Sequence, residues 1–228
     1  MYMRVNIDGA PAYAIAYCFL EAGETVFIEN GGMALMSEGI QVNMSTGGGL
    51  GKGLMRKAFG GESLIMGAYK AEVSGAWVAA SPKYPGDVRP LDLSTTGSLL
   101  AQSGALLAFD DRVDVSVRPS SVSSALATRG VTLLKMSGLG IAVIGTYGAI
   151  SEFDVKDGQS VIVDTGHLVA FSENMDIETG FLGGIVTSAA TGEALVSKLH
   201  GPGHVYIQTR AEEQLFGWIN PQRNQNEK

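Results

Sequence analysis

A repeat of about sixty residues limits what this chain can fold into more than any other feature of its sequence. Residues 86–115 (GDVRPLDLSTTGSLLAQSGALLAFDDRVDV) and 148–177 (GAISEFDVKDGQSVIVDTGHLVAFSENMDI) align without a gap. A second marker, with glycine in second place before a β-prone run, starts at residues 74, 137 and 200, which are evenly spaced. A similar unit therefore begins three times along the chain.

Each unit reads as short strands separated by glycine-rich bends. Residues 160–171 (SVIVDTGHLVAF) are two β-prone runs broken by Asp-Thr-Gly, which is typical of a hairpin. The bend glycines are expected to permit positive φ or close backbone approach. The chain has 31 glycines among 228 residues and only 17% charged residues. This composition favours an all-β, β-sandwich body with very little helix over a disordered chain.

The third unit is short at its C-terminal end, and its missing half is found at the N-terminus. Residues 25–40 (TVFIENGGMALMSEGI) resemble residues 160–175 (SVIVDTGHLVAFSENM). We expect the N-terminal half-repeat to complete the C-terminal one, so that three lobes close around a pseudo-threefold axis. The first and last strands would then pair, which leaves few free sheet edges. The predicted organisation is one β domain, 1–218, with pseudo-repeats at 64–125, 126–187, and 188–218 completed by 5–44.

A glycine-rich basic stretch, residues 45–63 (STGGGLGKGLMRKAFGGES), raises the question of a phosphate-binding loop. A P-loop requires G-x-x-x-x-G-K-[ST] between a strand and a helix of a parallel sheet. Around the Gly51-Lys52 pair, the first glycine is replaced by Thr46 and the hydroxyl residue by Gly53. The motif and its β context both exclude a P-loop, and the stretch is interpreted as an insertion.

Two interpretations of this insertion remain open. In the first, residues 50–59 form a short helix that caps one end of the β body. In the second, they form a basic amphipathic tip that contacts an anionic membrane or a protein partner. The candidate contact residues are Lys52, Leu54, Arg56, Lys57 and Phe59. A second helix is expected at 121–128, and a polar, disordered tail at 219–228.

Charge and cysteine content narrow the function classes. The formal net charge is −7, which lowers the expectation of nucleic-acid binding, because that binding depends on cations that displace counterions. Cys18 is the single cysteine, so an intrachain disulfide is excluded, and its apolar surroundings predict a buried side chain. The N-terminus lacks the features of a secretory or transit peptide, so a soluble cytoplasmic protein is expected.

Candidate catalytic or metal-binding residues are few. His200 and His204, with Asp164 and His167, have the residue types of a cupin-like metal site. However, the Gly-Pro-Gly between the first two makes a helical H-x₃-H pair implausible, and the other repeats lack ligands there. We interpret them as polar turn histidines and predict no metal or other cofactor.

The repeated aspartates Asp92 and Asp154, and Asp114 and Asp176, are predicted to cap turns or strand ends, because a catalytic residue seldom has a structural duplicate. Trp77 and Trp218 are expected in a core or an interface rather than in a ligand site.

Four motifs together resemble the bacterial branch of the altered-inheritance-of-mitochondria family of mitochondrial biogenesis proteins. They are GLGKGLMRKAFGGESL, KMSGLGIAVIGTYGAI, VDTGHLVAF and LHGPGHVYIQT, and the resemblance covers about residues 5–218. It implies a TRAP-like variant of the double-stranded β-helix and a homo-oligomer, and it brings no catalytic residues with it. The relation of that fold to an RNA-binding protein does not transfer the function.

The sequence therefore predicts a non-enzymatic oligomeric scaffold or interaction module, which could act at a membrane surface or on a protein partner. DNA is not an expected partner, and the acidic charge disfavours RNA. The alternative is a protein that binds a small ligand or RNA in a groove between repeats or subunits. A metal-dependent cupin-like enzyme is the less favoured third hypothesis.

Overall fold

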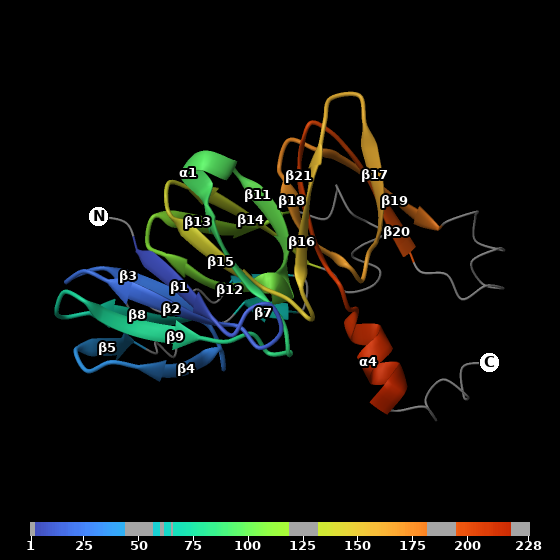
Figure 1. The fold of residues 1–228 in the computed structure, drawn as a ribbon. Coiled ribbons are helices and arrows are strands. Elements are labelled where there is room, and N and C mark those ends of the chain that lie inside the picture. Colours follow the sequence, from blue (N-terminus) through green and yellow to red (C-terminus); the bar gives the residue numbers. More distant parts are fainter. Residues whose placement is uncertain are drawn as a thin grey trace.

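The predicted all-β fold with very little helix is confirmed (Figure 1). The structure, a computed structural model, describes residues 3–43, 57–59, 62–64, 66–118, 132–181 and 195–219. Within these residues, helix is limited to α1 (Leu93–Thr96), the 3₁₀ turn η1 (Ser103–Ala105) and α4 (Glu212–Ile219). The other elements are strands, and every pair of named strands is antiparallel.

The described strands form four sheets and one separate hairpin, and the strands of each sheet are named below in their order across it. Sheet 1 consists of β1 (Arg4–Asp8), β2 (Ile15–Leu20), β9 (Ala76–Ala80) and β4 (Met33–Met36). Sheet 2 consists of β10 (Val88–Asp92), β15 (Ile141–Gly145), β12 (Leu106–Asp110), β3 (Thr25–Glu29), β8 (Met66–Ala71) and β5 (Ile40–Asn43). Sheet 3 consists of β13 (Val113–Val117), β14 (Leu133–Gly138), β11 (Leu99–Gln102), β18 (Leu168–Ser172), β21 (Gly203–Gln208) and β16 (Ile150–Val155). Sheet 4 consists of β17 (Ser160–Asp164), β20 (Leu195–His200) and β19 (Asp176–Phe181).

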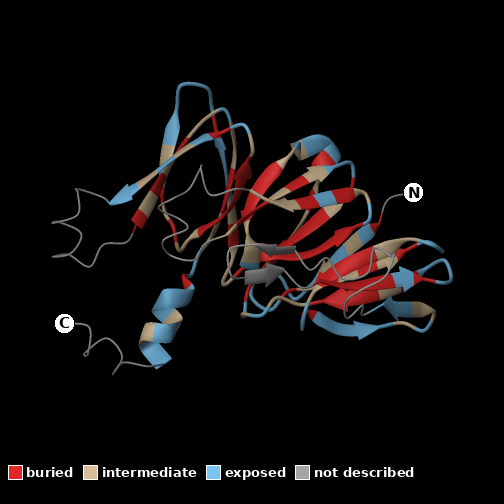
Figure 2. Cartoon of the chain, turned by 180° about the vertical axis from the view of Figure 1, so that it is seen from behind, coloured by how far each residue is buried: buried red, intermediate tan, exposed pale blue. Residues whose placement is uncertain are grey.

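Side chains of the described residues form three apolar cores between these sheets. Core 1 lies between sheets 1 and 2, core 2 between sheets 2 and 3, and core 3 between sheets 3 and 4. Successive side chains of a strand point to opposite faces, so each central sheet supplies two cores. On β3, for example, Ile28 is buried in core 1 and its neighbour Phe27 in core 2. Figure 2 shows buried residues in the strands between layers and exposed residues in the outer loops and α4.

The strand order is the same in successive sheets. The order β2-β9-β4 of sheet 1 recurs as β10-β15-β12 in sheet 2 and as β16-β21-β18 in sheet 3. The register recurs as well: pairing with the neighbouring strand shifts by one residue at Ala34, Leu107 and Val169, so the same β-bulge interrupts β4, β12 and β18. The strand order and the bulge recur even where the sequences differ, since β4 and β12 share few residues.

One hydrogen bond from backbone to side chain also recurs. The Trp77 N–H donates to Ser37 Oγ at 3.0 Å, and the His204 N–H donates to Ser172 Oγ at 2.9 Å. In the middle of the chain, the Ile141 N–H donates to Asp110 Oδ2 at 2.9 Å. Each bond ties the end of one strand to the start of another and so satisfies a donor that the bulged ladder leaves free.

The predicted closure around a threefold axis is wrong. The last strand, β21, pairs with β16 and β18 in sheet 3, whereas the first, β1, pairs with β2 in sheet 1. The N-terminal half-repeat joins β8 and β12 through β3 instead of completing residues 188–218. Sheets 1 and 4 are therefore the two ends of a row, as Figure 1 shows.

The hairpin predicted for residues 160–171 is also wrong, although both strands exist. β17 belongs to sheet 4 and β18 to sheet 3, so the Asp-Thr-Gly bend crosses between facing sheets. The marker glycines behave as expected: Gly75 and Gly138 have φ of 82° and 118°. A Cβ on Gly201, the third marker, would collide with the carbonyl oxygens of Val155 and Lys156.

The predicted helix over 50–59 is wrong at its C-terminal end. Residues Lys57–Phe59 form strand β6, which pairs with β7 (Glu62–Leu64). The Gly-Gly pair that separates these strands in the sequence favours a two-residue hairpin over a helix. Lys52, Leu54 and Arg56 lie outside the described residues, as do the helix predicted for 121–128 and residues 220–228 of the tail.

Candidate functional site

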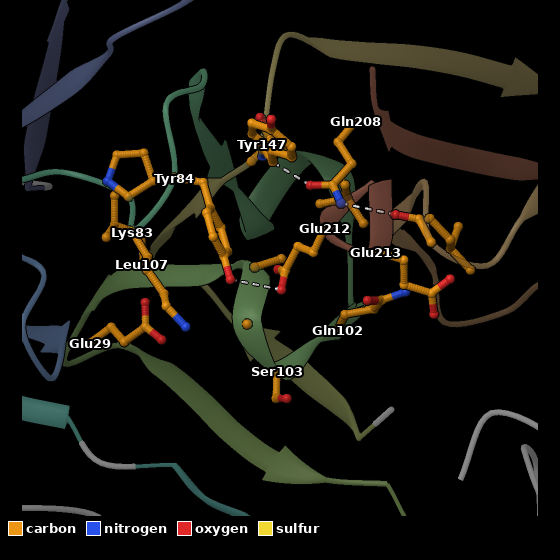
Figure 3. A pocket seen from close by; sticks show the side chains of 18 of the residues that line it. Glu29, Lys83, Tyr84, Gln102, Ser103, Leu107, Tyr147, Gln208, Glu212 and Glu213 are labelled. Carbon is orange, nitrogen blue, oxygen red and sulfur yellow. Dashed lines mark hydrogen bonds between the residues drawn. The ribbon is translucent and has the colours of Figure 1, made fainter. Parts of the chain in front are cut away.

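A groove formed by turns at the ends of strands is the candidate site (Figure 3). It encloses about 360 Å³, and turns from the first, middle and last parts of the chain converge on it. Some of its residues stand at the ends of equivalent strands in successive sheets. Glu29 is the last residue of β3 in sheet 2, and Gln102 is the last residue of β11 in sheet 3. It is lined by Glu29, Pro82, Lys83, Tyr84, Gln102, Ser103, Gly104, Ala105, Leu107, Gly145, Thr146, Tyr147, Thr165, Gly166, Leu168, Val169, Gln208, Glu212 and Glu213.

Two tyrosines and a lysine form one wall. The rings of Tyr84 and Tyr147 are 5.6 Å apart between centroids, and the Lys83 Nζ lies 5.2 Å from the Tyr84 ring centroid. Tyr84 Oη donates a hydrogen bond to Glu212 Oε2 at 3.0 Å, which joins this wall to the start of α4. Burial, followed by the hydrogen bond from Tyr84 to Glu212, raises the pKa of the Tyr84 phenol.

Two glutamine side chains form another part of the lining. Gln208 Oε1 accepts from the Tyr147 N–H at 3.0 Å, and its Nε2 donates to the Gly166 carbonyl at 3.0 Å. Gln102 Nε2 donates to the Thr165 carbonyl at 2.9 Å. These bonds use the amides to tie separate turns together, so the wall is fixed before any ligand arrives.

The groove is electronegative. Among the described residues that line it are three carboxylates, those of Glu29, Glu212 and Glu213, and one lysine, Lys83. Burial raises the pKa of the Glu29 carboxyl, Lys83 opposes that rise, and the charge of Glu212 adds to it. A cation placed between these carboxylates would relieve their repulsion, whereas a phosphate would add to it.

Helix α4 borders the groove and is almost wholly exposed (Figure 2). Ala211, immediately before the helix, is buried, and no residue of the helix itself is. Phe216, Trp218 and Ile219 are exposed, so the helix carries apolar side chains into solvent beside the acidic residues of its first turn. For Trp218 the structure therefore excludes a place in the core of the described chain.

The predicted burial of Cys18 is confirmed. The residue lies in core 1, and burial, with a smaller contribution from the charge of Asp110, raises the pKa of its thiol to about 12. Trp77 is half-buried on the outer face of sheet 1, where its ring and that of Tyr17 pack edge to face with centroids 5.5 Å apart. Neither residue lies in the groove.

The three histidines do not converge. His167 Nδ1 lies 2.7 Å from the Gln208 carbonyl oxygen. His200 Nε2 lies 3.4 Å from Glu178, and His204 Nδ1 lies 3.3 Å from Glu152, in both instances without hydrogen-bond geometry. Among the described residues, no three histidine, cysteine, aspartate or glutamate side chains gather where they could hold a metal ion.

The aspartate prediction is confirmed at Asp92. Its Oδ1 accepts hydrogen bonds from the Ser94 N–H at 2.9 Å and the Ser94 hydroxyl at 2.6 Å, and it caps α1. The hydrogen bond from the Ser94 hydroxyl, and after it the one from the Ser94 N–H, lower the pKa of the Asp92 carboxyl. Asp114, Asp154 and Asp176 are exposed strand residues outside the groove.

Comparison with known proteins places the chain in a family. The model of the mitochondrial biogenesis family AIM24 matches residues 5–210. The chain belongs to the AIM24 family. An uncharacterized protein of Streptococcus pyogenes serotype M6 is 28% identical over 225 residues, which cover 95% of this chain and 90% of that protein. The X-ray structure of a Streptococcus pyogenes protein is similar to this AIM24 chain with a TM-score of 0.78 and 26% identity, over 96% of this chain and 99% of the other.

Sequence reasoning missed the groove of this AIM24 protein. One signal was present: Tyr84 and Tyr147 follow the same marker segments of successive repeats at a constant spacing. The partners of these tyrosines, Glu212 and Gln208, carry no motif, because their roles depend on turns that only the folded chain brings together. Among the described residues, no helix has the length and apolar character needed to cross a membrane.

Proposed function

We propose that this protein is a non-enzymatic scaffold whose groove holds a cationic segment of a protein partner. The observation that carries the proposal is the groove's charge: Glu29, Glu212 and Glu213, with Lys83 as the one lysine among the described lining residues, line a cavity whose walls are tied by hydrogen bonds. A fixed electronegative site selects a cation by Coulomb attraction and needs little reorganisation to bind it.

The exposed side of α4 supports a polypeptide as the occupant. Phe216 and Trp218 lie on the helix whose first turn supplies Glu212 to the groove. Aromatic side chains are frequent anchors in protein interfaces, and here they flank a site for positive charge. A partner segment with basic residues followed by apolar ones would satisfy both features.

The test is a titration with two short synthetic peptides, one alternating lysine with leucine and the other alternating glutamate with leucine. We expect only the lysine peptide to bind, as measured by fluorescence anisotropy. The double variant Glu29→Gln, Glu212→Gln should weaken binding about tenfold, which corresponds to about 1.4 kcal/mol. Glu72→Gln, an exposed carboxylate outside the groove, is the matched control. Equal binding by wild type and the double variant, or preference for the glutamate peptide, would contradict the proposal.

A small cationic ligand is the second candidate, because the cavity lies at the lower end of the roughly 300–1,000 Å³ range of ligand pockets. Spermidine is a suitable probe. Competition between spermidine and the lysine peptide places both in the groove, whereas tight spermidine binding without any peptide binding favours the small ligand. The same charge argues against RNA, whose phosphates the glutamates would repel.

Action at a membrane surface is a separate part of the scaffold hypothesis and depends on Lys52, Arg56 and Lys57. Replacing all three by glutamate should abolish co-sedimentation with vesicles that contain phosphatidylserine. If the wild-type protein and the triple variant sediment equally, the membrane role is excluded and the groove proposal is unaffected.

A further inference from the structure

Two junctions inside the molecule join strands from different parts of the chain into continuous sheets. In sheet 2, β12 pairs with β3, and Phe109 lies opposite Phe27. In sheet 3, β18 pairs with β11, and Phe171 lies opposite Leu100. Both junctions are antiparallel and place equivalent residues opposite each other, because Phe109 and Phe171 each stand two residues after the recurrent bulge.

The same kinds of strand form unpaired edges at the two ends of the row. β4 has the place and the bulge of β12 and β18, but in the described structure it is the last strand of sheet 1. β17 has the place of β3 and β11, but among the described strands it is the outermost strand of sheet 4 on the corresponding side. In the described structure, sheet 1 therefore carries the strand equivalent to β12 and β18 without its junction partner, and sheet 4 carries the strand equivalent to β3 and β11 without its junction partner.

Exposure of the side chains at these edges supports the comparison. In the internal junctions, Phe109 is 2% exposed and Phe27 is 7% exposed. Their counterparts at the ends are Met36 on β4, 40% exposed, and Ile162 on β17, 56% exposed. Apolar side chains at these positions are buried wherever the junction is made, and they are exposed where it is not.

Within the described part of the chain, the two edges also lack the features that normally block edge pairing. Native sheets protect their edges with charged side chains, proline or coverage by other elements. The opposite edge strands of the same sheets follow this pattern, since β1 exposes Arg4 and Asp8, and β19 exposes Asp176 and Glu178. The sequences of β4, MALM, and of β17, SVIVD, place a charge only at the last residue of β17.

We propose that β4 of one copy of this chain pairs antiparallel with β17 of the next copy, which joins the copies head to tail. The internal registers define the pairing: Leu35 opposite Val163, Met36 opposite Ile162, and Ser37 opposite Val161. The joined strands continue sheet 1 of one copy into sheet 4 of the other, as in the central sheets. The two surfaces differ, so the contact is heterologous and extends to a ring or a filament.

An ion pair gives an independent reason to choose a second copy as the occupant. Lys135 Nζ lies 2.9 Å from Glu173 Oε1 across the β11–β18 junction. Lys198 has the place of Lys135, because it stands opposite Ile162 as Lys135 stands opposite Leu100. Glu38 follows Ser37 as Glu173 follows Ser172. The proposed junction brings Lys198 of one copy to Glu38 of the other, so this chain carries both complementary charges.

The test uses two variants that each block one edge. Met36→Lys blocks β4 and Ile162→Lys blocks β17, and both positions are exposed enough to accept lysine in the folded monomer. By light scattering, we expect wild type to form multimers and each variant to be a monomer of 23.8 kDa. Mixed together, the variants should form a dimer and nothing larger, because one intact β4 then meets one intact β17. Phe153→Lys, which alters another exposed apolar residue on an edge strand of sheet 3, should leave the multimer unchanged.

A charge exchange tests the register separately. Lys198→Glu and Glu38→Lys should each raise the dissociation constant of the multimer, and the double variant should restore most of the affinity. A monomeric wild type at high concentration would overturn the proposal. So would assembly that survives Met36→Lys, or a mixture of the two blocked variants that remains monomeric. The groove is not involved in any of these measurements, so their outcome is independent of the proposed function.

Discussion

The two end sheets of the molecule have corresponding strand orders but opposite outer surfaces. On sheet 1, the outward face carries aromatic residues: Tyr17 meets Trp77 edge to face, and the Arg4 guanidinium lies 4.8 Å from the Phe19 ring centroid. On sheet 4, most outward positions hold charged or polar side chains, among them Lys198 and Glu178, which stand opposite each other on β20 and β19.

The difference shows which positions determine the fold. On sheet 1, Cys18 and Val78 face inward and are fully buried, and on sheet 4 Leu199 does the same. The inward positions keep an apolar character because a one-residue slip would expose them all. The outward positions escape that constraint, and they are where the two ends can acquire different binding properties.

The largest expected effect comes from comparing an inward and an outward substitution on β20, a strand of sheet 4. Leu199→Ala removes a fully buried side chain from core 3 and should lower the free energy of unfolding by about 2–5 kcal/mol. Val196→Ala, on the outward face of the same strand, should cost about 1 kcal/mol or less. Urea denaturation of dilute protein measures both. Equal losses would show that the outward face of sheet 4 is also packed.

The reactivity of a thiol should differ between the inner face of sheet 1 and the outer face of sheet 4. Because the pKa of Cys18 is raised to about 12, the native thiol should react with Ellman's reagent at pH 8 only on unfolding. A cysteine introduced outward on sheet 4 by Ser160→Cys should react at least roughly a hundredfold faster.

The raised pKa of Cys18 also has a stability consequence. Its folded value exceeds the unfolded value of 9.0, so the unfolded chain loses its proton first. Stability should therefore fall as the pH rises from 9 toward 12. A Cys18→Ala variant should show a weaker fall over this range, and an identical pH profile would contradict the assignment.

The smallest expected effect compares two carboxylates at equivalent strand ends. The pKa of Glu29, at the end of β3, is raised, so ionisation costs stability as the pH rises above the unfolded value of 4.5. Glu29→Gln should slightly raise the Tm at pH 7 and leave it unchanged below pH 4. Asp164→Ala, at the end of β17, should lower the Tm, because the Gly166 N–H loses an acceptor at 2.9 Å. Shifts of the same sign would show that the two strand ends are not electrostatically distinct.

Strands were predictable from the sequence because their signal is local. The runs 25–29 and 160–164 each contain three consecutive β-prone apolar residues and end at bends that contain glycine, and both form strands. Their partners were not predictable. β17 and β18 are neighbours in sequence but lie in different sheets, and the choice between a hairpin and a crossover depends on a facing sheet that a local pattern does not contain.

The same limit explains the wrong closure and the missed site. Gly31 and Gly166 do occupy equivalent places, but equivalence alone does not say whether the two half-repeats pair with each other or with intervening strands. Helix α4 was predictable from a local pattern, because two acidic residues, Glu212 and Glu213, precede a run with apolar residues, as is typical of a helix N-terminus. Its position beside Tyr84 was not predictable, because it depends on a contact between residues 128 positions apart.

The sharing of each central sheet between two cores has a consequence for how the protein comes apart. Neither sheet 2 nor sheet 3 can separate from one neighbour without disturbing side chains that serve the other, so the middle of the molecule contains no independently removable part. Amide exchange should then be slowest in β12, β15, β11 and β18 and faster toward β1 and β19. A copy joined at both ends would lose this gradient, since each end sheet would become an interior one.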